Sequence, residues 1–370
     1  MAAMPRVDVA TLRRMRIAAQ LLHRPAGRSA ADVVRHLIGI QAQASMAAEL
    51  GIRARSRRIT LEDVDRARLE ERSIVRAWAM RGTLHLVAAE DLGWLVPLTA
   101  ERSRPRSHRR LDEEGVPAAT VGRALGLIRD MLAAEGPLTR PEIAERLRRR
   151  RVPAEGQAIH HLTWLAASDG TVCFGPTRSG RRTLVLARDW VGRSPALGRE
   201  RALAELASRY LAAHGPSAPE DLAYWSGLRA TDVRRAWTLI ADRLRPVETA
   251  GPTLWRLKGR QSRAGPGLIR LLPMFDEYLL GWRSRDLVLA ERQRRAVVPG
   301  GGVIHRSVIA DGTVRGTWTV EATPEKLVVT VHPLIGLGAF RRSLALEAED
   351  VGRFRGDPGV ELRIVRLATR

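Results

Sequence analysis

The sequence contains a single cysteine, Cys173, among 370 residues. One thiol cannot form a disulfide within the chain, and it excludes every zinc site that needs several cysteines. His160 and His161 are adjacent and therefore point to different sides of a helix, and no His-x-x-x-His motif occurs. We expect no metal centre, and the lone cysteine agrees with a reducing compartment.

Motifs for nucleotide binding and segments for membrane insertion are also missing. The sequence has neither G-x-x-x-x-G-K-S/T nor a G-x-G-x-x-G that follows a strand. We expect no ATP site and no cofactor. No apolar run reaches about eighteen residues, and residues 1–10 lack the apolar core of a signal peptide. These absences predict a soluble, cytoplasmic protein, and we expect it to associate with the nucleoid.

Lysine is scarce, since only Lys258 and Lys326 occur, yet 62 Lys and Arg residues outnumber 40 Asp and Glu residues and give a net charge of +22. One explanation is a GC-rich genome that encodes arginine for every surface cation. The other is a polyanionic partner, because guanidinium groups bind phosphates bidentately. The charge exceeds what solubility requires, so we favour DNA or RNA. A membrane surface fits less well, because the basic residues do not form one amphipathic face.

A repeat organises much of the chain. Segments 136–144 and 215–223 both begin with Gly-Pro, and Thr139 with Glu142 and Ser217 with Glu220 have the spacing of a capping box. Each segment predicts the start of a helix, followed by a second helix and a β-hairpin. A third copy begins with predicted helix caps at Ser29 and Thr60. The predicted hairpin strands are 73–80 with 83–88, 171–175 with 183–187, and 245–248 with 254–257. Helix, helix and hairpin form the winged-helix unit.

The sequence after about residue 262 has a different pattern. Short apolar segments there predict β-strands, and Asp311-Gly312 predicts a hairpin turn between two of them. The expected elements are strands at 268–272, 303–309, 314–320 and 326–331, a helix at 342–354 and a last strand at 360–365. Five or six short strands suggest a small barrel or a curled sheet. We therefore predict an α+β protein with three tandem winged-helix units and, of these two alternatives, a small C-terminal β-barrel. The predicted domains are 1–115, 116–195, 196–262 and 263–370.

Gln41 and Gln43 flank one small apolar residue just after a predicted helix. On an extended backbone the two side chains project to the same side, whereas on a helix they diverge. Two carboxamides supply hydrogen-bond donors and acceptors but do not titrate. From spacing alone, the alternative is that both amides face solvent or cap neighbouring backbone groups.

Several separated blocks carry a resemblance to a known family. They are GIQAQ (39–43), VRAWAMRGTLHL (75–86), HHL (160–162), DGTVC (169–173), DLAYWSGL (221–228) and LLPMFDEYLLG (271–281). In this order they resemble the AlkZ/YcaQ-type family of winged-helix DNA glycosylases across essentially the whole chain. Gln41-Ala42-Gln43 is similar to the Gln-apolar-Gln motif of the AlkZ branch, whereas the other branch has Gln-apolar-Asp.

The resemblance implies a C-shaped arrangement around a DNA channel and excision of alkylated purines from double-stranded DNA. An N7-alkylguanine or N3-alkyladenine carries a positive charge, so its base leaves without a general acid. Water must still be placed against C1′, and carboxamides can hold it by hydrogen bonds. We therefore assign Gln41 and Gln43 as catalytic residues that hold the water. Neutral lesions such as uracil are expected to be poor substrates, and bulky natural-product adducts or interstrand crosslinks are expected targets.

Other candidate residues lie in the same blocks. Arg81, Thr83 and His85 alternate along the first predicted wing and share a face that could meet phosphate or lesion; the alternative is a hairpin turn with a packed histidine. Asp276 and Tyr278 also share a face if their segment is extended, and the resemblance places that block in the cleft. An aspartate there could stabilise a cationic purine.

The amine inventory predicts the outcome of the reaction. Bifunctional glycosylases use an amine as nucleophile and form a Schiff base. Neither Lys258 nor Lys326 lies in a motif block, so we expect a monofunctional enzyme that leaves an abasic site. We expect a monomer. The rival interpretation is a non-catalytic winged-helix transcriptional regulator, but such proteins commonly dimerise on palindromes, and this chain shows no long apolar dimerisation helix.

Overall fold

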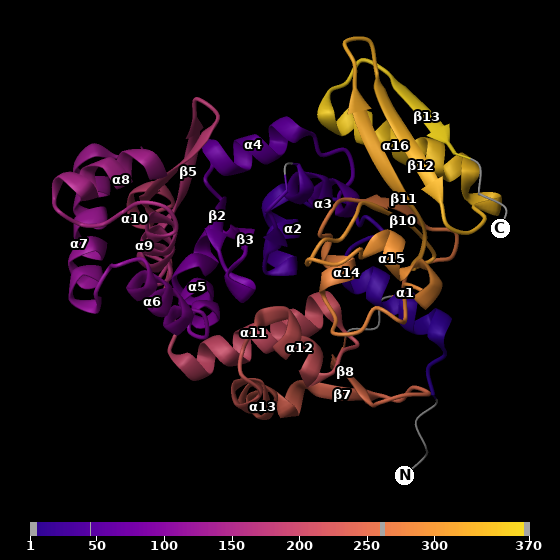
Figure 1. The fold of residues 1–370 in the computed structure, drawn as a ribbon. Helices are drawn as coiled ribbons and strands as arrows, with labels where there is room; N and C mark the ends of the chain where they lie inside the picture. The colour runs from indigo at the N-terminus through magenta and orange to yellow at the C-terminus, as the bar shows by residue number, and fades with distance from the viewer. Residues whose placement is uncertain (1–5, 45, 260–262, 366–370) are drawn as a thin grey trace.

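The protein has a mixed α+β fold (Figure 1). The structure, a computed structural model, describes residues 6–44, 46–259 and 263–365, so the predicted boundary at 262 lies outside the described residues. The helices are α1 (Val9–Ala19), α2 (Ala30–Leu37), α3 (Ala47–Arg55), α4 (Leu61–Leu69), α5 (Leu92–Ala100), α6 (Arg104–Glu113), α7 (Ala118–Glu135), α8 (Arg140–Arg149), α9 (Ala158–Ala167), α10 (Ala187–Trp190), α11 (Arg199–His214), α12 (Pro219–Ser226), α13 (Ala230–Leu239), α14 (Glu277–Leu280), α15 (Arg294–Val297) and α16 (Arg341–Arg355).

The strands form three sheets. They are β1 (Ile40–Gln41), β2 (Ile74–Trp78), β3 (Leu84–Ala88), β4 (Leu138–Thr139), β5 (Val172–Arg178), β6 (Arg181–Leu186), β7 (Leu244–Val247), β8 (Leu254–Leu257), β9 (Ile269–Leu272), β10 (Ser307–Ala310), β11 (Thr313–Ala322), β12 (Leu327–Pro333) and β13 (Val360–Ile364). The three predicted hairpins correspond to the antiparallel pairs β2–β3, β5–β6 and β7–β8.

Three of the four predicted helix caps, at Ser29, Thr60 and Thr139, are confirmed. The predicted box at α8 is confirmed, because the Glu142 carboxylate accepts a hydrogen bond from the Thr139 backbone N–H at 2.7 Å. The box predicted at Ser217 is wrong. Helix α12 begins one residue later, with the Asp221 carboxylate accepting from the Ala218 backbone N–H at 3.0 Å, while the Ser217 hydroxyl bonds the carbonyl of the preceding helix end.

One six-stranded sheet, in the order β1-β3-β2-β5-β6-β4, joins the first two predicted units. Strands β2 and β5 pair antiparallel with Arg76 opposite Phe174. The rings of Trp78 and Phe174 pack beside this pairing at a centroid distance of 4.5 Å. These two units therefore share a sheet.

The C-terminal strands form an open five-stranded sheet, in the order β13-β12-β11-β10-β9, so the predicted closed barrel is wrong for the described residues. The Asp311-Gly312 hairpin turn is confirmed between β10 and β11, with Ala310 paired to Thr313. The sheet does not need to close on itself, because α16 packs across it and contributes Leu344, Val351 and Phe354 to the core it shares with the strands.

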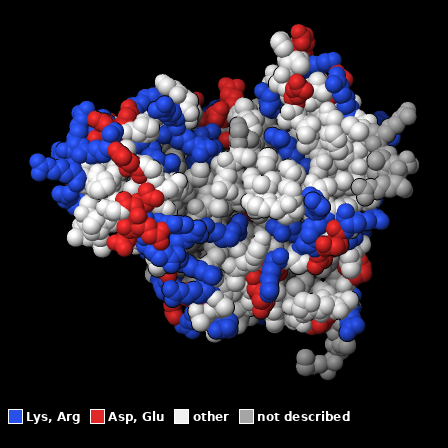
Figure 2. Space-filling model, in the orientation of Figure 1, with Lys and Arg blue, Asp and Glu red and all other residues white. Residues whose placement is uncertain are grey.

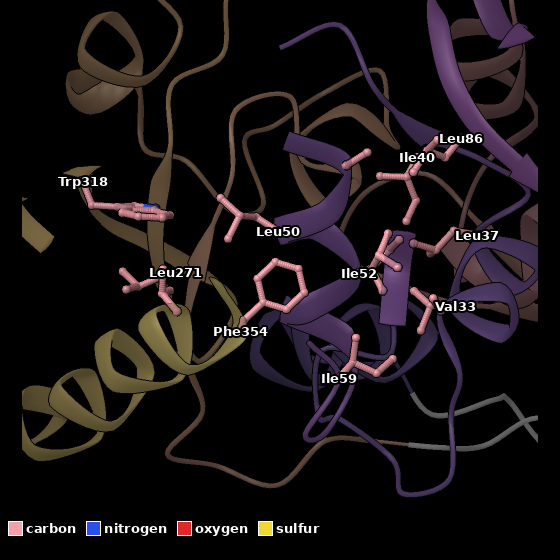
Figure 3. Packing of buried hydrophobic residues seen from close by; sticks show 14 of the residues in the cluster. Val33, Leu37, Ile40, Leu50, Ile52, Ile59, Leu86, Leu271, Trp318 and Phe354 are labelled. Atoms are coloured by element: carbon pink, nitrogen blue, oxygen red, sulfur yellow. The ribbon is translucent and has the colours of Figure 1, made fainter. Parts of the chain in front are cut away.

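That core also includes the first helices of the chain. Figure 3 shows Phe354 of α16 pointing toward Leu50 and Ile52 of α3, with Val33 and Leu37 of α2 on the other side. In Figure 1, α2 to α4 lie between the region of α7 to α9 and the C-terminal sheet, and α11 to α13 lie below. The two ends of the chain are thus built around one core, beside which the glutamine segment lies. No helix among the described residues is long and apolar enough to cross a membrane.

Candidate active site

The glutamine segment leaves α2 through a left-handed residue, Ile38 (φ 68°), and then becomes extended. Strand β1 pairs with β3, with Gln41 opposite His85, and the Ala42 backbone N–H donates to the Leu84 carbonyl at 2.7 Å. The extended backbone places both amides on one side, where Gln41 Nε2 donates to Gln43 Oε1 at 2.5 Å. Gln41 is buried and Gln43 is exposed, so the hydrogen bond between them joins a buried amide to an amide at the surface.

Glu277 at the start of α14 holds the other side of this segment. Its Oε1 accepts from the Gln41 backbone N–H at 3.0 Å, and its Oε2 accepts from the indole N–H of Trp225 in α12, also at 3.0 Å. Burial raises the pKa of Glu277 to about 6, although both hydrogen bonds and nearby Arg81 oppose the shift. The carboxylate therefore connects three elements that are distant in sequence.

Sequence reasoning missed Glu277 and selected its neighbours. The segment is not extended: Asp276 caps α14 by accepting from the Tyr278 backbone N–H at 2.8 Å. Both oxygens of Asp276 accept from the Arg55 guanidinium at 2.8 Å in a fully buried ion pair. The Tyr278 hydroxyl donates to the Gly312 carbonyl at 3.1 Å. Both residues lie in the interior; an aspartate followed by glutamate was the available signal for a helix start.

The first hairpin contributes Arg81, Thr83 and His85. The turn at Arg81-Gly82 has two consecutive left-handed residues, with φ values of 57° and 73°. The Arg81 guanidinium donates to the Trp225 carbonyl and, at 3.5 Å, to Gln41 Oε1. His85 is buried with its Nδ1 2.9 Å from the Thr83 carbonyl oxygen, and burial lowers its pKa to about 3. The imidazole is therefore neutral.

A cavity of about 700 Å³ opens in front of the glutamines. Its polar lining residues include Gln41, Gln43, Arg81 and Thr83. Its other lining residues are mostly apolar or glycine, with one further arginine: Ala44, Tyr224, Phe275, Leu280, Arg285, Val298, Gly301, Gly302, Val303 and Ile304. His85, Asp276 and Tyr278 are not among its lining residues. The cavity thus combines two amides and two guanidinium groups with largely apolar surroundings.

Neither lysine contributes to this cavity. Lys258 is exposed just after β8, and Lys326 pairs with Glu361 in the C-terminal sheet at 2.5 Å. Across the described ranges, no group of three or more His, Cys, Asp and Glu side chains could hold a metal ion. Cys173 is buried, and burial raises the pKa of its thiol to about 12. The functional groups in the described cavity wall are therefore amides, hydroxyls and guanidinium groups.

Comparisons with known proteins agree in sequence and in fold. A family model described as DNA glycosylase AlkZ-like matches residues 34–354. A relative from Streptomyces sahachiroi, described as an interstrand DNA cross-link repair glycosylase, is 31% identical over 363 residues, or 91% of this chain and 94% of the relative. The solved structure of the Streptomyces sahachiroi DNA glycosylase AlkZ matches with a TM-score of 0.80 at 29% identity, covering 98% of this chain and all of that one.

Proposed function

The chain belongs to the DNA glycosylase AlkZ-like family and is a DNA glycosylase, and from this premise we propose that it excises cationic N7- and N3-alkylated purines by water attack at C1′. The observation that carries the proposal is the joined pair Gln41 and Gln43 at the mouth of the cavity. The regulator interpretation has no comparable support, because the matched proteins are described as glycosylases.

In the proposed reaction, a carboxamide oxygen of Gln41 or Gln43 accepts a hydrogen bond from a water and turns its lone pair toward C1′. The water oxygen bonds C1′ while the C1′–N9 bond breaks. The electron pair of that bond neutralises the cationic purine, which leaves without protonation. The proton of the attacking water passes to bulk solvent, since amides do not accept it. The glutamines therefore contribute position rather than acid–base chemistry.

The size of the cavity supports bulky substrates. Its volume of about 700 Å³ and its apolar lining residues would accommodate an alkyl group larger than methyl. Because the Streptomyces sahachiroi relative is described as a cross-link repair glycosylase, we extend the proposal to bulky adducts and interstrand crosslinks.

The proposal includes the arrangement of the DNA-binding units. Each strand pair β2–β3, β5–β6 and β7–β8 follows a pair of helices, which supports three winged-helix units in the regions 1–115, 116–195 and 196–262, with 263–370 as a fourth region. We propose that these units line an open C-shaped channel for duplex DNA in a monomeric, cytoplasmic enzyme. Because the first two regions share a sheet and the first and last share a core, we do not expect them to fold separately.

The test is release of N7-methylguanine from duplex DNA, with alkali cleavage to reveal abasic sites. The Gln41→Ala/Gln43→Ala variant should lose base release by about 100-fold or more, as expected when the positioning of a reactant is lost, and should keep the wild-type affinity for the duplex. Base release at the wild-type rate by this variant would contradict the assignment of the glutamines.

The same reaction mixture tests for a lyase step. Since neither Lys258 nor Lys326 lines the cavity, borohydride should trap no covalent protein–DNA adduct, and strand breaks should form only after alkali. A trapped adduct would show that an amine attacks C1′ and would contradict a monofunctional mechanism.

A further inference from the structure

A second cavity, of about 460 Å³, lies on the other side of the Arg81-Gly82 turn and is named here the arginine pocket. Its lining residues are Arg81, Gly82, Ser103, Arg106, Ser107, Arg110, Glu114, Gln157, His160, His161 and Trp164. Arg81 is common to both cavities. A Cβ at Gly82 would lie 3.6 Å from Ser103 Oγ and 3.7 Å from Trp164 Nε1, so this turn separates the glutamines from the pocket.

Hydrogen-bond donors outnumber acceptors in the arginine pocket. The Trp164 side chain is largely buried, with a relative exposure of 5%, and it lines the pocket beside the Arg81-Gly82 turn. The guanidinium of Arg106 is exposed and lacks an acceptor in the described part of the chain. Glu114 is the one carboxylate among the lining residues. A pocket lined by three arginines and an indole N–H favours a ligand that brings acceptor oxygens.

The charge of the pocket selects an anion. Arg106 and Arg110 are one helical turn apart on α6 and line the same cavity, and Arg110 is also paired with Glu113 outside it at 2.7 Å. The pKa of His161 is lowered by burial and then by Arg110 and Arg106. Figure 2 shows Lys and Arg side chains at the left and lower left of this face, with a group of Asp and Glu side chains between them, in the region where Figure 1 places α5 to α9.

We propose that the arginine pocket binds a backbone phosphate of the DNA, close to the nucleotide held at Gln41 and Gln43. A phosphodiester supplies two acceptor oxygens and one negative charge, which match the Trp164 indole N–H and the Arg106 guanidinium. Arg81 links the two sites, because its guanidinium contacts Gln41 while its residue lines both cavities. The inference rests on the proposed function, and it identifies where the damaged strand is held.

The first test measures duplex affinity as a function of salt concentration. Arg106→Gln should lower the magnitude of the slope of log K against log salt by about 1, as expected when one phosphate contact is lost. Arg109→Gln is the matched control, because Arg109 is an exposed arginine of the same helix that does not line the pocket. Trp164→Phe should weaken binding with an unchanged slope, because it removes a neutral donor.

The second test locates the phosphate. Methylphosphonate, which lacks the negative charge, replaces one phosphate at a time around an N7-methylguanine in a short duplex. With wild type, replacement at one position near the lesion should weaken binding by about tenfold. With Arg106→Gln, methylphosphonate at that position should cause no further loss of binding affinity. With Arg109→Gln, it should weaken binding by the same factor as with wild type.

The outcomes separate this inference from the proposed function. An interference pattern that is the same for wild type and Arg106→Gln would overturn the phosphate site, even if base release is normal. Calorimetric binding of inorganic phosphate that duplex DNA does not displace would assign the pocket to a free anion and would also overturn it. Absence of base release by wild type, with Arg106-dependent interference intact, would overturn the proposed function and support the pocket.

Discussion

Glu277 is a buried residue that holds the backbone of Gln41 in place, and the variant Glu277→Gln tests whether this contact positions the glutamine pair. The carboxylate accepts from two N–H groups, those of Gln41 and Trp225. An amide of the same shape has one oxygen, so its NH₂ group must face one of these donors. Leaving a buried donor without an acceptor costs about 1–3 kcal/mol. If that cost appears as misplacement of the glutamines in the transition state, the rate falls roughly 5- to 150-fold.

The assay is single-turnover base release at saturating enzyme, together with duplex affinity. Glu277→Gln should lower the rate at saturation and leave the affinity near the wild-type value, because Glu277 does not line the cavity. Glu49→Gln is the matched control: Glu49 is also a buried carboxylate, but it pairs with Arg68 and Arg76 at 3.5 Å. An equal loss of rate in both variants would attribute the effect to general stability.

The pH dependence of the base-release rate distinguishes a positioning role of Glu277 from a purely structural one. Burial raises the pKa of Glu277 to about 6, so the wild-type carboxyl gains a proton as the pH falls below 6 and no longer accepts from both N–H groups. The wild-type rate should therefore decline below pH 6, and this decline should be absent in Glu277→Gln. A variant with the wild-type rate and an unchanged acid limb would refute the positioning role.

Two further predictions concern buried groups near the site. Burial lowers the pKa of His85 to about 3, so NMR should show a neutral imidazole from pH 8 to 5. Below about pH 6.5 the His85 imidazole of the unfolded chain binds a proton, whereas that of the folded chain does not. His85 therefore lowers the free energy of unfolding as the pH falls below about 6.5. Asp276→Asn should reduce the free energy of unfolding by about 3–5 kcal/mol in urea titrations, because it leaves buried Arg55 without its charge partner. The exposed pair Arg188–Asp189 is the control, and Asp189→Asn should change stability by less than about 1 kcal/mol; similar losses in both variants would contradict the reasoning.

Local chemistry explains the parts of the fold that sequence predicted. Asp311 and Gly312 both have positive φ, 46° and 79°, as a two-residue hairpin turn requires, and this fixed the pairing of β10 with β11. The Thr139–Glu142 box likewise depends on residues three apart. The extended backbone at Gln41 to Gln43 was stated only as a condition, and pairing with β3 supplies it.

Tertiary contacts explain what sequence missed. Glu277 meets the Gln41 backbone across 236 residues, and no pattern within either segment records that approach. The barrel prediction failed for a similar reason: the five predicted strands all occur in the sheet, but whether a sheet closes depends on what covers its apolar face. Here α16 and α3 cover it, with Phe354 packed against Leu50 and Ile52. Asp276 was selected for its charge, yet Arg55 already neutralises it in the interior.

The described lining of the cavity also bears on general acid catalysis, because the usual proton donors are not among its side chains. No carboxylate or imidazole lines it: the carboxyl of Glu277 lies behind the Gln41 backbone, and the nearby imidazole of His85 is buried and neutral. General acid catalysis ordinarily contributes about 10²- to 10⁴-fold, and a neutral base leaving this cavity would forgo it. A cationic purine needs no such help, because breaking its glycosidic bond neutralises the base. Under the proposed mechanism, the two amides beside Arg81 would therefore be sufficient for this class of lesion, and lesions whose base must be protonated to leave are expected to be poor substrates.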